Sequence, residues 1–447
     1  MEAIQPIISD PRSALVALVA VSGLTTAVWW TISYLTSPLR QYPGPFLAGW
    51  TNWWRFFLVR TGSYHIGIKK LHDEYGPVVR IGPNTLDIDY PELSKTFYGT
   101  DGKWKKTEFY HNNSAVVNGK ITYHLFSETD QANHARMKRP IVHYYSASSV
   151  AALEPLMDKV IGDFCGHLET RFMGKTSKSF DLGEWIAFSG QIPFLDFLLD
   201  KNPVMRIGPP NLGNVTRISL EHLIARLQGK DANFDPEVPD FLQHFVDTKK
   251  TSPDLVDDGI IMGYLLVNLL AGADTTAITL RAIFYYALRE PRAYRKLEDE
   301  ILAADLGGAV PRYGACRKLP YLEAVVREAS RLHPGVCMLL ERYRWLRGEE
   351  ESEEEYRRRL RRFNAADLTF GGGSHVCIGR NLALLETYKV VATIVRRYHV
   401  ELEDPAREWK VTGSWFTRQK GGLDCRLRLR CGQTPANGRD GVAHRDS

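Results

Sequence analysis

The strongest constraint on the fold is an uncharged stretch of 23 residues, "SALVALVAVSGLTTAVWWTISYL", which begins at Ser13 and ends at Leu35. A helix of this length crosses a bilayer, and Trp29, Trp30 and Tyr34 fall where an interfacial aromatic belt would lie. A cleaved signal peptide is the alternative, but the apolar stretch is too long for one and no basic segment precedes it. We therefore expect this stretch to be a transmembrane anchor.

The anchor also sets the orientation of the chain. More arginines follow the span than precede it, so the positive-inside rule places residues 1–12 in the lumen and the bulk of the chain in the cytosol. Prolines then stiffen residues 36–47 and forbid a continuous helix. We predict a single-pass anchor over residues 13–35, a proline-rich hinge, and one large domain over residues 48–430. The polar tail, residues 431–447, is expected to be disordered.

The composition of the whole chain suits a folded body and argues against several classes of protein. A hydrophobic fraction of 44% supports a substantial core. Helical patterns dominate, and alternating apolar and polar residues predict strands only within 77–90 and 423–430, so the fold class is mainly α with minor β. A net charge of +5 is small for this length and argues against nucleic-acid binding. The six cysteines contain no C-x-x-C pair, which argues against a zinc module or a disulfide scaffold.

A second long apolar run covers residues 259–290 and contains the segment "AGADTT". A second membrane span is one interpretation, but Asp274 and its neighbouring hydroxyls are costly in lipid. A helix buried through the centre of the domain fits better. The small residues Ala271 and Gly272 would let a flat group approach the backbone, and the hydroxyl of Thr275 could bond a carbonyl of the preceding turn and bend the helix.

A third stretch, "YLEAVVREASRLHPG", covers residues 321–335. Its helical pattern places one apolar face on Leu322, Val325, Val326, Ala329 and Leu332. Glu328 and Arg331 lie three residues apart on another face, close enough to form an ion pair. By itself such a pair is a surface feature worth little energy. The dipeptide at 333–334, His-Pro, should end the helix.

The fourth stretch, "FGGGSHVCIGRNLALLE", runs from Phe370 to Glu386 and places a single cysteine, Cys377, among glycines. A helical pattern begins directly after it, near Gly379. The positive end of that helix and its free N–H groups would stabilise a thiolate at Cys377. A buried free cysteine in a glycine turn is the plain alternative.

Together and in this order, "AGADTT", "EASR" and "FGGGSHVCIG" resemble the motifs of the cytochrome P-450 superfamily, which contains haem-thiolate enzymes. The cysteine loop is the most specific of the three. Its motif positions are filled by Phe370, Gly373, His375, Cys377 and Gly379. The resemblance runs from the proline hinge to about Arg430, and finer likeness points to microsomal fungal enzymes of the pisatin demethylase type.

The resemblance implies a haem b group whose iron is bound by the thiolate of Cys377, a ligand that favours O–O cleavage. Gly373 and Gly379 would permit tight turns and a close approach of the porphyrin, and Phe370 would shield the sulfur from water. His375 would reach a haem propionate. By the same resemblance, His134 and Lys138 occupy the spacing of propionate-binding residues, with Arg139 as an alternative for the basic position and a plain surface helix as an alternative for the segment.

On the opposite side of the haem, the resemblance gives Asp274 and Thr275 the delivery of protons during oxygen activation, which favours a monooxygenase over a rearrangement enzyme. Ala271 and Gly272 would leave room beside the haem, and Glu328 with Arg331 would be structural. The candidates for the substrate pocket are Leu269, Ala273, Val336 and Trp415. Their apolar character suggests a lipophilic small molecule as the substrate, together with O2.

The implied partners follow from what the chain lacks and from the resemblance. It contains no G-x-G-x-x-G after a strand and no P-loop, so NADPH would act indirectly, through an NADPH-cytochrome reductase. The anchor resembles that of microsomal members, which implies the endoplasmic reticulum membrane with a cytosolic catalytic domain. A role in secondary metabolism follows from the subfamily likeness alone.

The chain also departs from the family pattern. Cys377 follows Arg331 by only 46 residues, and we expect segments of the family pattern to be lacking near residues 188–190 and 340–345. The arginine that would complete the interaction with Glu328 and Arg331 is missing or displaced. Two interpretations follow: a shortened working monooxygenase, or a truncated or mis-spliced pseudoenzyme without activity. A third, a metal site built from His375 and Cys377, lacks enough ligands.

Overall fold

The computed structural model describes residues 11–99, 104–117, 120–173, 179–190, 213–232, 234–336, 352, 354–355, 357–358, 367–413 and 416–431. The chain divides into two compact units. The first unit comprises residues 1–93 with the pieces 337–339 and 411–416, and the second comprises the rest.

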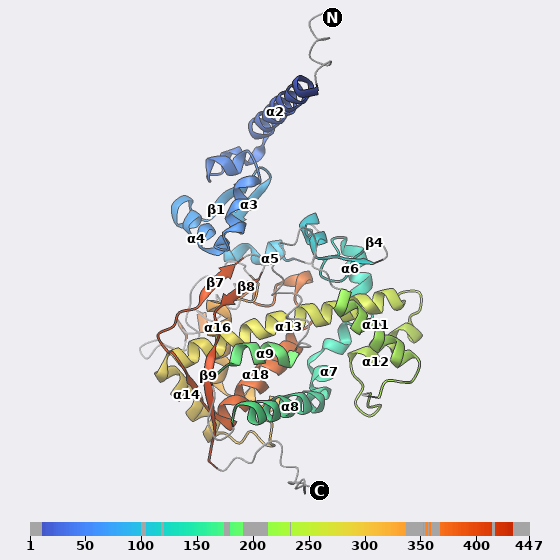
Figure 1. The fold of residues 1–447 in the computed structure, drawn as a ribbon, viewed down its shortest axis with the longest axis vertical. Coiled ribbons are helices and arrows are strands. Elements are labelled where there is room, and N and C mark those ends of the chain that lie inside the picture. The colour runs from blue at the N-terminus through green and yellow to red at the C-terminus, as the bar shows by residue number, and fades with distance from the viewer. Residues whose placement is uncertain are drawn as a thin grey trace, which may run out of the picture. The chain divides into compact units, whose positions relative to one another are not determined.

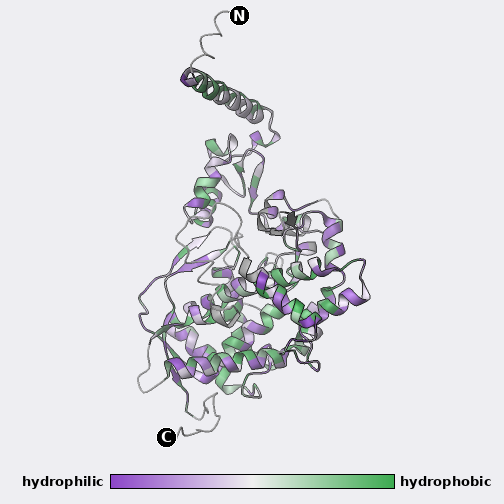
Figure 2. Ribbon diagram, turned by 45° about the vertical axis from the view of Figure 1, so that its right-hand side comes forward, coloured by the Kyte–Doolittle hydropathy of each residue, from purple (hydrophilic) through white to green (hydrophobic). Residues whose placement is uncertain are grey.

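The first unit begins with the helix α2 (Pro11–Thr36), which contains the predicted anchor. It is long and apolar enough to cross a membrane, and none of its residues is buried. Figure 2 shows the helix as mainly hydrophobic or neutral beyond its first turn. Its threonine hydroxyls bond carbonyls of the same helix, as Thr26 does to Ser22 at 2.7 Å and Thr31 to Ala27 at 2.8 Å. The helix therefore satisfies these polar groups internally, as a lipid environment requires.

The remainder of the first unit is a small body built around a hairpin (Figure 1). Its elements are the 3-10 turns η1 (Pro38–Gln41), η2 (Phe46–Gly49) and η3 (Pro91–Leu93), the helices α3 (Trp53–Arg60) and α4 (Tyr64–Tyr75), and the strands β1 (Val78–Gly82) and β2 (Thr85–Ile88). The two strands pair antiparallel, which confirms the strands predicted within 77–90. Ile68, Val79 and Ile81 form the buried core.

The second unit is mainly helical, as the fold class predicted. Its helices are α5 (Ser94–Phe97), α6 (Gln131–Lys138), α7 (Ala147–Ala152), α8 (Glu154–Phe172), α9 (Leu182–Gly190), α11 (Gly213–Leu227), α12 (Phe241–Thr251), α13 (Asp258–Arg289), α14 (Pro291–Ala303), α15 (Tyr313–Cys316), α16 (Pro320–Leu332) and α18 (Arg380–Arg397). Its 3-10 turns are η4 (Glu108–Asn113), η5 (Val142–Tyr145) and η6 (Gly373–His375). Its strands are β3 (Ala115–Val117), β4 (Lys120–Thr122), β5 (Phe180–Asp181), β6 (Tyr398–Leu402), β8 (Thr417–Lys420) and β9 (Asp424–Leu429), while β7 (Lys410–Gly413) belongs to both units.

The helix α13 organises the second unit. It packs against six other helices, namely α9, α11, α12, α14, α16 and α18, and Figure 1 shows it running through their midst. Leu280, Ile283 and Phe284 are among its buried residues. Although the helix is also long and apolar enough to span a membrane, this packing supports the prediction of a helix buried in the domain.

Two further predictions can be checked in the second unit. The strand β9 pairs with β6 and β5 in an antiparallel sheet, with Tyr398 opposite Leu429, which confirms the strand predicted within 423–430. The helix α16 ends at Leu332, as the His-Pro dipeptide predicted. On its apolar face Leu322 is buried, whereas Leu332 in the last turn is 43% exposed.

Several predictions lie outside the described residues. These are the missing segment near 340–345, the tail from residue 432 onward, and the pocket candidate Trp415. The backbone of Phe188–Gly190 belongs to α9, but the side chains there are outside the description. The domain boundaries remain a prediction.

Candidate active site

The loop before α18 is held by backbone hydrogen bonds, and its backbone leaves least room for a side chain at Gly373. The N–H of Cys377 donates to the carbonyl of Phe370 at 2.7 Å, which closes the loop. Gly373 has a φ of +52°, and a Cβ there would lie 1.4 Å from the carbonyl oxygen of Tyr98. A side chain is therefore forbidden both by conformation and by the backbone of Tyr98. The need for glycine at position 373 therefore comes from a contact within the protein, and the sequence did not reveal that contact.

Gly379 differs from Gly373. It lies in the turn that precedes α18, as its N-cap, with a φ of −79°, a conformation that any residue adopts, so this turn does not itself require glycine. A Cβ at Gly379 would have one neighbour within 4 Å, the sulfur of Cys377 at 3.9 Å. Its lack of a side chain therefore keeps the space beside the sulfur open.

The Cys377 thiol lies where the sequence predicted, just before the first turn of α18, and its side chain is exposed. The protein atoms packed around it raise the pKa of the thiol above its ordinary value by desolvation. The N–H groups of Gly379 and Arg380 and the charges of Lys138 and Arg380 act in the opposite direction. Bonding to a metal removes the thiol proton outright, so the helix end would then stabilise the sulfur's charge.

A cluster of four basic side chains lies near this loop. His134 and Lys138 come from α6 and His375 from η6, as expected for groups that share a site, and Lys106 joins them from the segment before η4. The rings of His134 and His375 are 6.0 Å apart. In the part of the chain that the structure describes, the buried Nδ1 of His375 has no hydrogen-bond partner.

The basic cluster is electrostatically unfavourable as it stands. Desolvation, then repulsion from Lys106, Lys138 and His375, lowers the pKa of His134 to about 4. Desolvation lowers the pKa of Lys106 to about 8, although its ammonium donates to the carbonyls of Leu125 and Phe126 at 3.2 and 3.0 Å. Four cationic or protonatable groups and an orphaned ring nitrogen suit an anion with several oxygens.

The facing helix, α13, carries the acid and the hydroxyl that the sequence singled out. The hydroxyl of Thr275 donates to the carbonyl of Ala271 at 2.7 Å, which confirms the bond predicted for it. Ala271 and Gly272 are exposed, and a Cβ at Gly272 would have no neighbour within 4 Å. This part of α13 therefore opens onto free space beside Thr275.

Asp274 has a partner that the sequence did not reveal. Nη2 of Arg418, on β8, lies 3.7 Å from Oδ2 of Asp274. The strand is fastened beside α13, because the side-chain amide of Gln419 donates to the carbonyl of Ile278 at 3.2 Å. Its N-terminal end is fastened too, since the N–H of Thr417 donates to the carbonyl of Gly335, also at 3.2 Å. These bonds hold the strand that carries Arg418 beside Asp274.

The pair on α16 forms as predicted. Nε of Arg331 donates to Oε2 of Glu328 at 2.7 Å, and Nη2 of Arg331 bonds the other carboxylate oxygen. The contact is bidentate and Arg331 is only 13% exposed on its side chain, so it is more than a loose surface pair. The family pattern has a third residue, an arginine, that completes the interaction with Glu328 and Arg331. The segment in which this arginine was expected lies outside the described residues.

Comparison with known proteins identifies the family. The family model described as cytochrome P-450 matches residues 211–345 and 344–423. The cytochrome P-450 monooxygenase cfoH of Aspergillus candidus is 37% identical to this chain over 526 aligned residues, covering 98% of this chain and 97% of the relative. The chain belongs to the cytochrome P-450 family. The monooxygenase cicH of Emericella nidulans is 30% identical, covering 89% of this cytochrome P-450 and 95% of the relative.

The comparisons also bear on the shortened regions. The alignment with cfoH spans 526 positions, more than the 447 residues of this cytochrome P-450, so the relative has residues with no counterpart here. The two segments matched by the family model meet at residues 344 and 345, within the stretch where a missing segment was predicted. The exact places of the missing residues remain a prediction.

The residues present fit the haem that the family implies. An exposed sulfur at Cys377 supplies an iron ligand, and the basic cluster supplies partners for two carboxylates. The open face at Gly272 leaves room for a flat group. Among the described residues, no three side chains of His, Cys, Asp or Glu approach closely enough to hold a metal ion by themselves.

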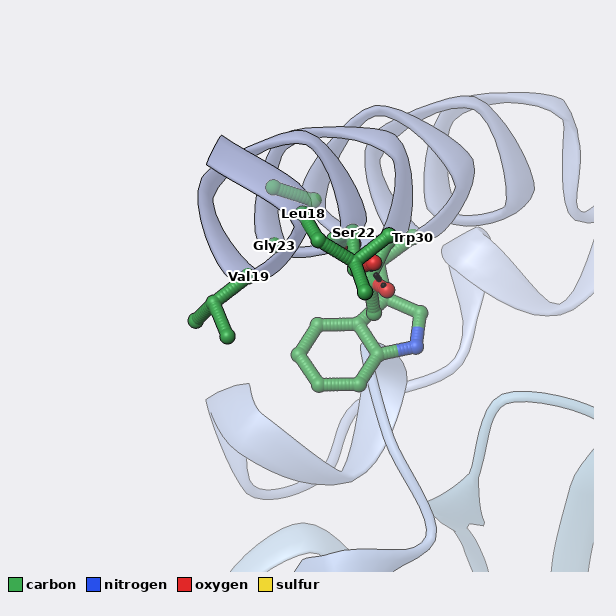
Figure 3. Close-up of a pocket in the computed structure, with 7 residues that line it drawn as sticks. Leu18, Val19, Ser22, Gly23 and Trp30 are labelled. Carbon is green, nitrogen blue, oxygen red and sulfur yellow. Dashed lines mark hydrogen bonds between the residues drawn. The ribbon is translucent and has the colours of Figure 1, made fainter. Parts of the chain in front are cut away.

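The structure supports the substrate-pocket candidates only in part. A Cβ at Gly335 would lie 3.5 Å from Thr275, so the neighbouring Val336 is near α13. On α13 itself, Leu269 is 43% exposed and Ala273 is half-buried. The hollow drawn in Figure 3 belongs to α2 and lies among Leu18, Val19, Ser22, Gly23, Thr26, Ala27 and Trp30. It contains no titratable group and is not the reaction site.

Lys106 gives a test of the basic cluster that does not require catalysis. In Lys106→Met we expect haem affinity to fall about 10- to 100-fold, because a charged hydrogen bond to a propionate is lost. The folded pKa of about 8 lies below the ordinary 10.5, so the unfolded chain binds more protons between these values. The stability of the haem-free protein should therefore rise as pH rises from about 8 to 10.5, and the variant should lose this slope.

The measurements for Lys106→Met are haem titration and thermal unfolding of the haem-free protein across that pH range. Lys105→Met is the matched control, because Lys105 is an exposed neighbour on the same segment. Equal haem affinity in the two variants would contradict a role for Lys106 in holding haem.

Proposed function

We propose that this cytochrome P-450 is a membrane-bound monooxygenase that inserts one atom of O2 into a lipophilic small molecule of secondary metabolism. The observation that carries the proposal is one set of three features: the exposed thiol of Cys377, the basic cluster, and the acid and hydroxyl of α13. The relatives named above are fungal monooxygenases of the same family, which supports the reaction class.

The overall reaction fixes what must be supplied. A substrate C–H bond, O2, NADPH and one proton give an alcohol, water and NADP+, so two electrons and two protons reach the site for each oxygen atom inserted. When bound, haem supplies the redox chemistry that activates O2. We propose that an NADPH-cytochrome reductase delivers the electrons and that the protein resides in the endoplasmic reticulum membrane with its catalytic domain in the cytosol.

The chain's own residues would hold the haem and move the protons. The sulfur of Cys377 would bind the iron, and His134, Lys138, His375 and Lys106 would bind the propionates. The hydroxyl of Thr275 donates its hydrogen bond to the carbonyl of Ala271, which leaves its oxygen lone pairs free to accept a hydrogen bond from water or from the substrate side. Asp274 would supply protons from its carboxyl, and Arg418 would restrain that carboxyl.

Thr275 provides the test of this function. In Thr275→Ala, NADPH consumption should stay within a few-fold of wild type, whereas product formed per NADPH should fall by about tenfold or more and hydrogen peroxide should rise, because protons are no longer delivered in place. The measurement combines NADPH oxidation, peroxide release and mass spectrometry of lipophilic metabolites, with a reductase present.

Thr279→Ala is the matched control, because Thr279 lies one turn later and its hydroxyl bonds the carbonyl of Thr275 at 3.0 Å in the same way. Identical product yield in wild type and Thr275→Ala would contradict the proposed role.

A pseudoenzyme is the second candidate, and the residues that this chain lacks relative to cfoH favour it. Haem content separates the two functions. A chain that folds but takes up no haem when haem is supplied would be a pseudoenzyme.

A further inference from the structure

One buried tyrosine of the second unit, Tyr145, connects the two helices on which the candidate active site depends. It is the last residue of η5 and is 4% exposed. Its hydroxyl donates to Oδ1 of Asn268 on α13 at 2.7 Å, and its carbonyl accepts a hydrogen bond from Nδ2 of Asn381 on α18 at 2.8 Å. Asn268 precedes Thr275 by about two helical turns, and Asn381 lies in the first turn of α18, just after Cys377.

The ring of Tyr145 is fixed by its packing, so its hydroxyl has a defined direction. The ring stacks on Phe241 of α12 with centroids 4.6 Å apart, and it belongs to the buried cluster that also contains Phe245. Desolvation raises the pKa of the hydroxyl above its ordinary value, so the group stays protonated and acts as a donor. Ile378, the residue after Cys377, packs against the same cluster. The start of α18 is therefore in contact with the core that holds Tyr145.

A second buried tyrosine continues this chain of bonds to α6. Tyr264 of α13 is 2% exposed, and its hydroxyl donates to the carbonyl of Met137 at 2.6 Å. Met137 lies in α6 between His134 and Lys138 of the basic cluster. The three helices α6, α13 and α18 are thus joined by side-chain hydrogen bonds through Tyr264 and Tyr145. Each of these bonds is shielded from water, so its loss would leave a polar group poorly satisfied.

These hydrogen bonds provide something that apolar packing does not. Burial of apolar surface is non-directional, so it holds two helices together without fixing their register, whereas a hydrogen bond requires a defined distance and angle. We propose that Tyr145 is a positioning residue that holds α13 and the start of α18 in register, so that the acid, the hydroxyl and the thiol are arranged before haem binds. The inference rests on the haem site of the proposed function.

The test compares wild type with Tyr145→Phe, which keeps the ring and removes only the hydroxyl. Hydrogen–deuterium exchange of the haem-free full chain in detergent is followed by mass spectrometry over residues 264–276 and 377–386. Without the bond to Asn268, Tyr145 is held less firmly, and its carbonyl in turn holds Asn381 less firmly. We expect amide exchange in both segments to be about fivefold faster or more, because local opening of each segment costs less.

Tyr144→Phe is the matched control, because Tyr144 is the preceding residue of η5 and its hydroxyl accepts a bond from Oγ1 of Thr248 at 3.2 Å. This variant loses a side-chain hydrogen bond of the same kind, but one to α12, so exchange in the two segments should stay at the wild-type rate. Asn268→Leu removes the acceptor and should reproduce Tyr145→Phe. The double variant should exchange no faster than either single variant, since both changes remove one bond.

The proposal is overturned if Tyr145→Phe speeds exchange in only one of the two segments or in neither. It is also overturned if Tyr144→Phe speeds exchange in both to the same extent, because Tyr145 would then be an ordinary core residue.

Haem binding gives a second readout. In Tyr145→Phe the strongly red-shifted Soret band of the reduced carbon monoxide complex should be lost on standing about fivefold faster than in Tyr144→Phe, because the start of α18 holds the sulfur less firmly. Equal lifetimes of the band would overturn the proposal that Tyr145 positions the thiol. If wild type takes up no haem, the proposed function fails, whereas exchange in the haem-free chain still decides whether Tyr145 couples α13 to α18.

Discussion

Replacing Cys377 by serine should abolish the strongly red-shifted Soret band of the reduced carbon monoxide complex and reduce monooxygenase activity below detection. A hydroxyl remains protonated at neutral pH and cannot replace the thiolate as a donor to iron. The structure leaves the sulfur of Cys377 exposed beside the start of α18, and no neighbouring side chain takes up its position. Difference spectroscopy of the membrane-expressed protein measures this outcome directly.

Cys431→Ser is the control for this experiment, because Cys431 is the other exposed thiol among the described residues. It should give the wild-type spectrum. If Cys377→Ser kept the red-shifted band, another group would bind the iron and the site would be wrongly assigned. If wild type itself lacked a haem band, the residues missing relative to its relatives would be needed for haem binding.

The second large effect is expected for Gly373→Ala, which should destabilise the protein by about 3 kcal/mol or more and prevent haem uptake. A residue with a side chain is strained in the left-handed backbone conformation at φ +52°, and its Cβ would overlap the carbonyl oxygen of Tyr98. The loop can relieve the overlap only by moving, which displaces His375 and Cys377. Thermal unfolding and haem content measure the two parts of this effect.

Gly379→Ala separates the demands of the protein from those of the haem. Its backbone is unstrained and the nearest atom to the new methyl group is the sulfur of Cys377, so the haem-free protein should keep its stability within about 1 kcal/mol. If the porphyrin approaches this position closely, haem content should fall in Gly379→Ala without a loss of stability, whereas Gly373→Ala loses both. Equal stability of Gly373→Ala and wild type would contradict the contact with Tyr98.

The parts of the structure that could be predicted are those with a local pattern in the sequence. The alternation within 77–90 predicted strands there, although not their pairing as a hairpin, and the apolar run with internal polar residues predicted that α13 is a buried helix. The bond from Thr275 to Ala271 and the pair of Glu328 with Arg331 also followed, because residues three or four apart meet on one helix face.

The parts that could not be predicted join distant segments. Lys106 reaches the basic cluster from a segment without periodic pattern, and Arg418 reaches Asp274 from a strand 144 residues further along the chain. The need for glycine at position 373 comes from the backbone of Tyr98, which no side-chain pattern records. Such contacts are set by the tertiary fold, so a single sequence contains no signal for them.

The desolvation of the basic cluster has a consequence for the amount of this protein in the cell. Desolvation first, and repulsion among the basic groups second, lower the pKa values of His134 and Lys106, so in the folded, haem-free chain their charged forms carry a cost that the carboxylates of haem would relieve. A ligand that binds only the folded state raises the folded population in proportion to its supply. Haem availability should therefore set the lifetime of newly made chains, with those that fail to acquire it removed by quality control.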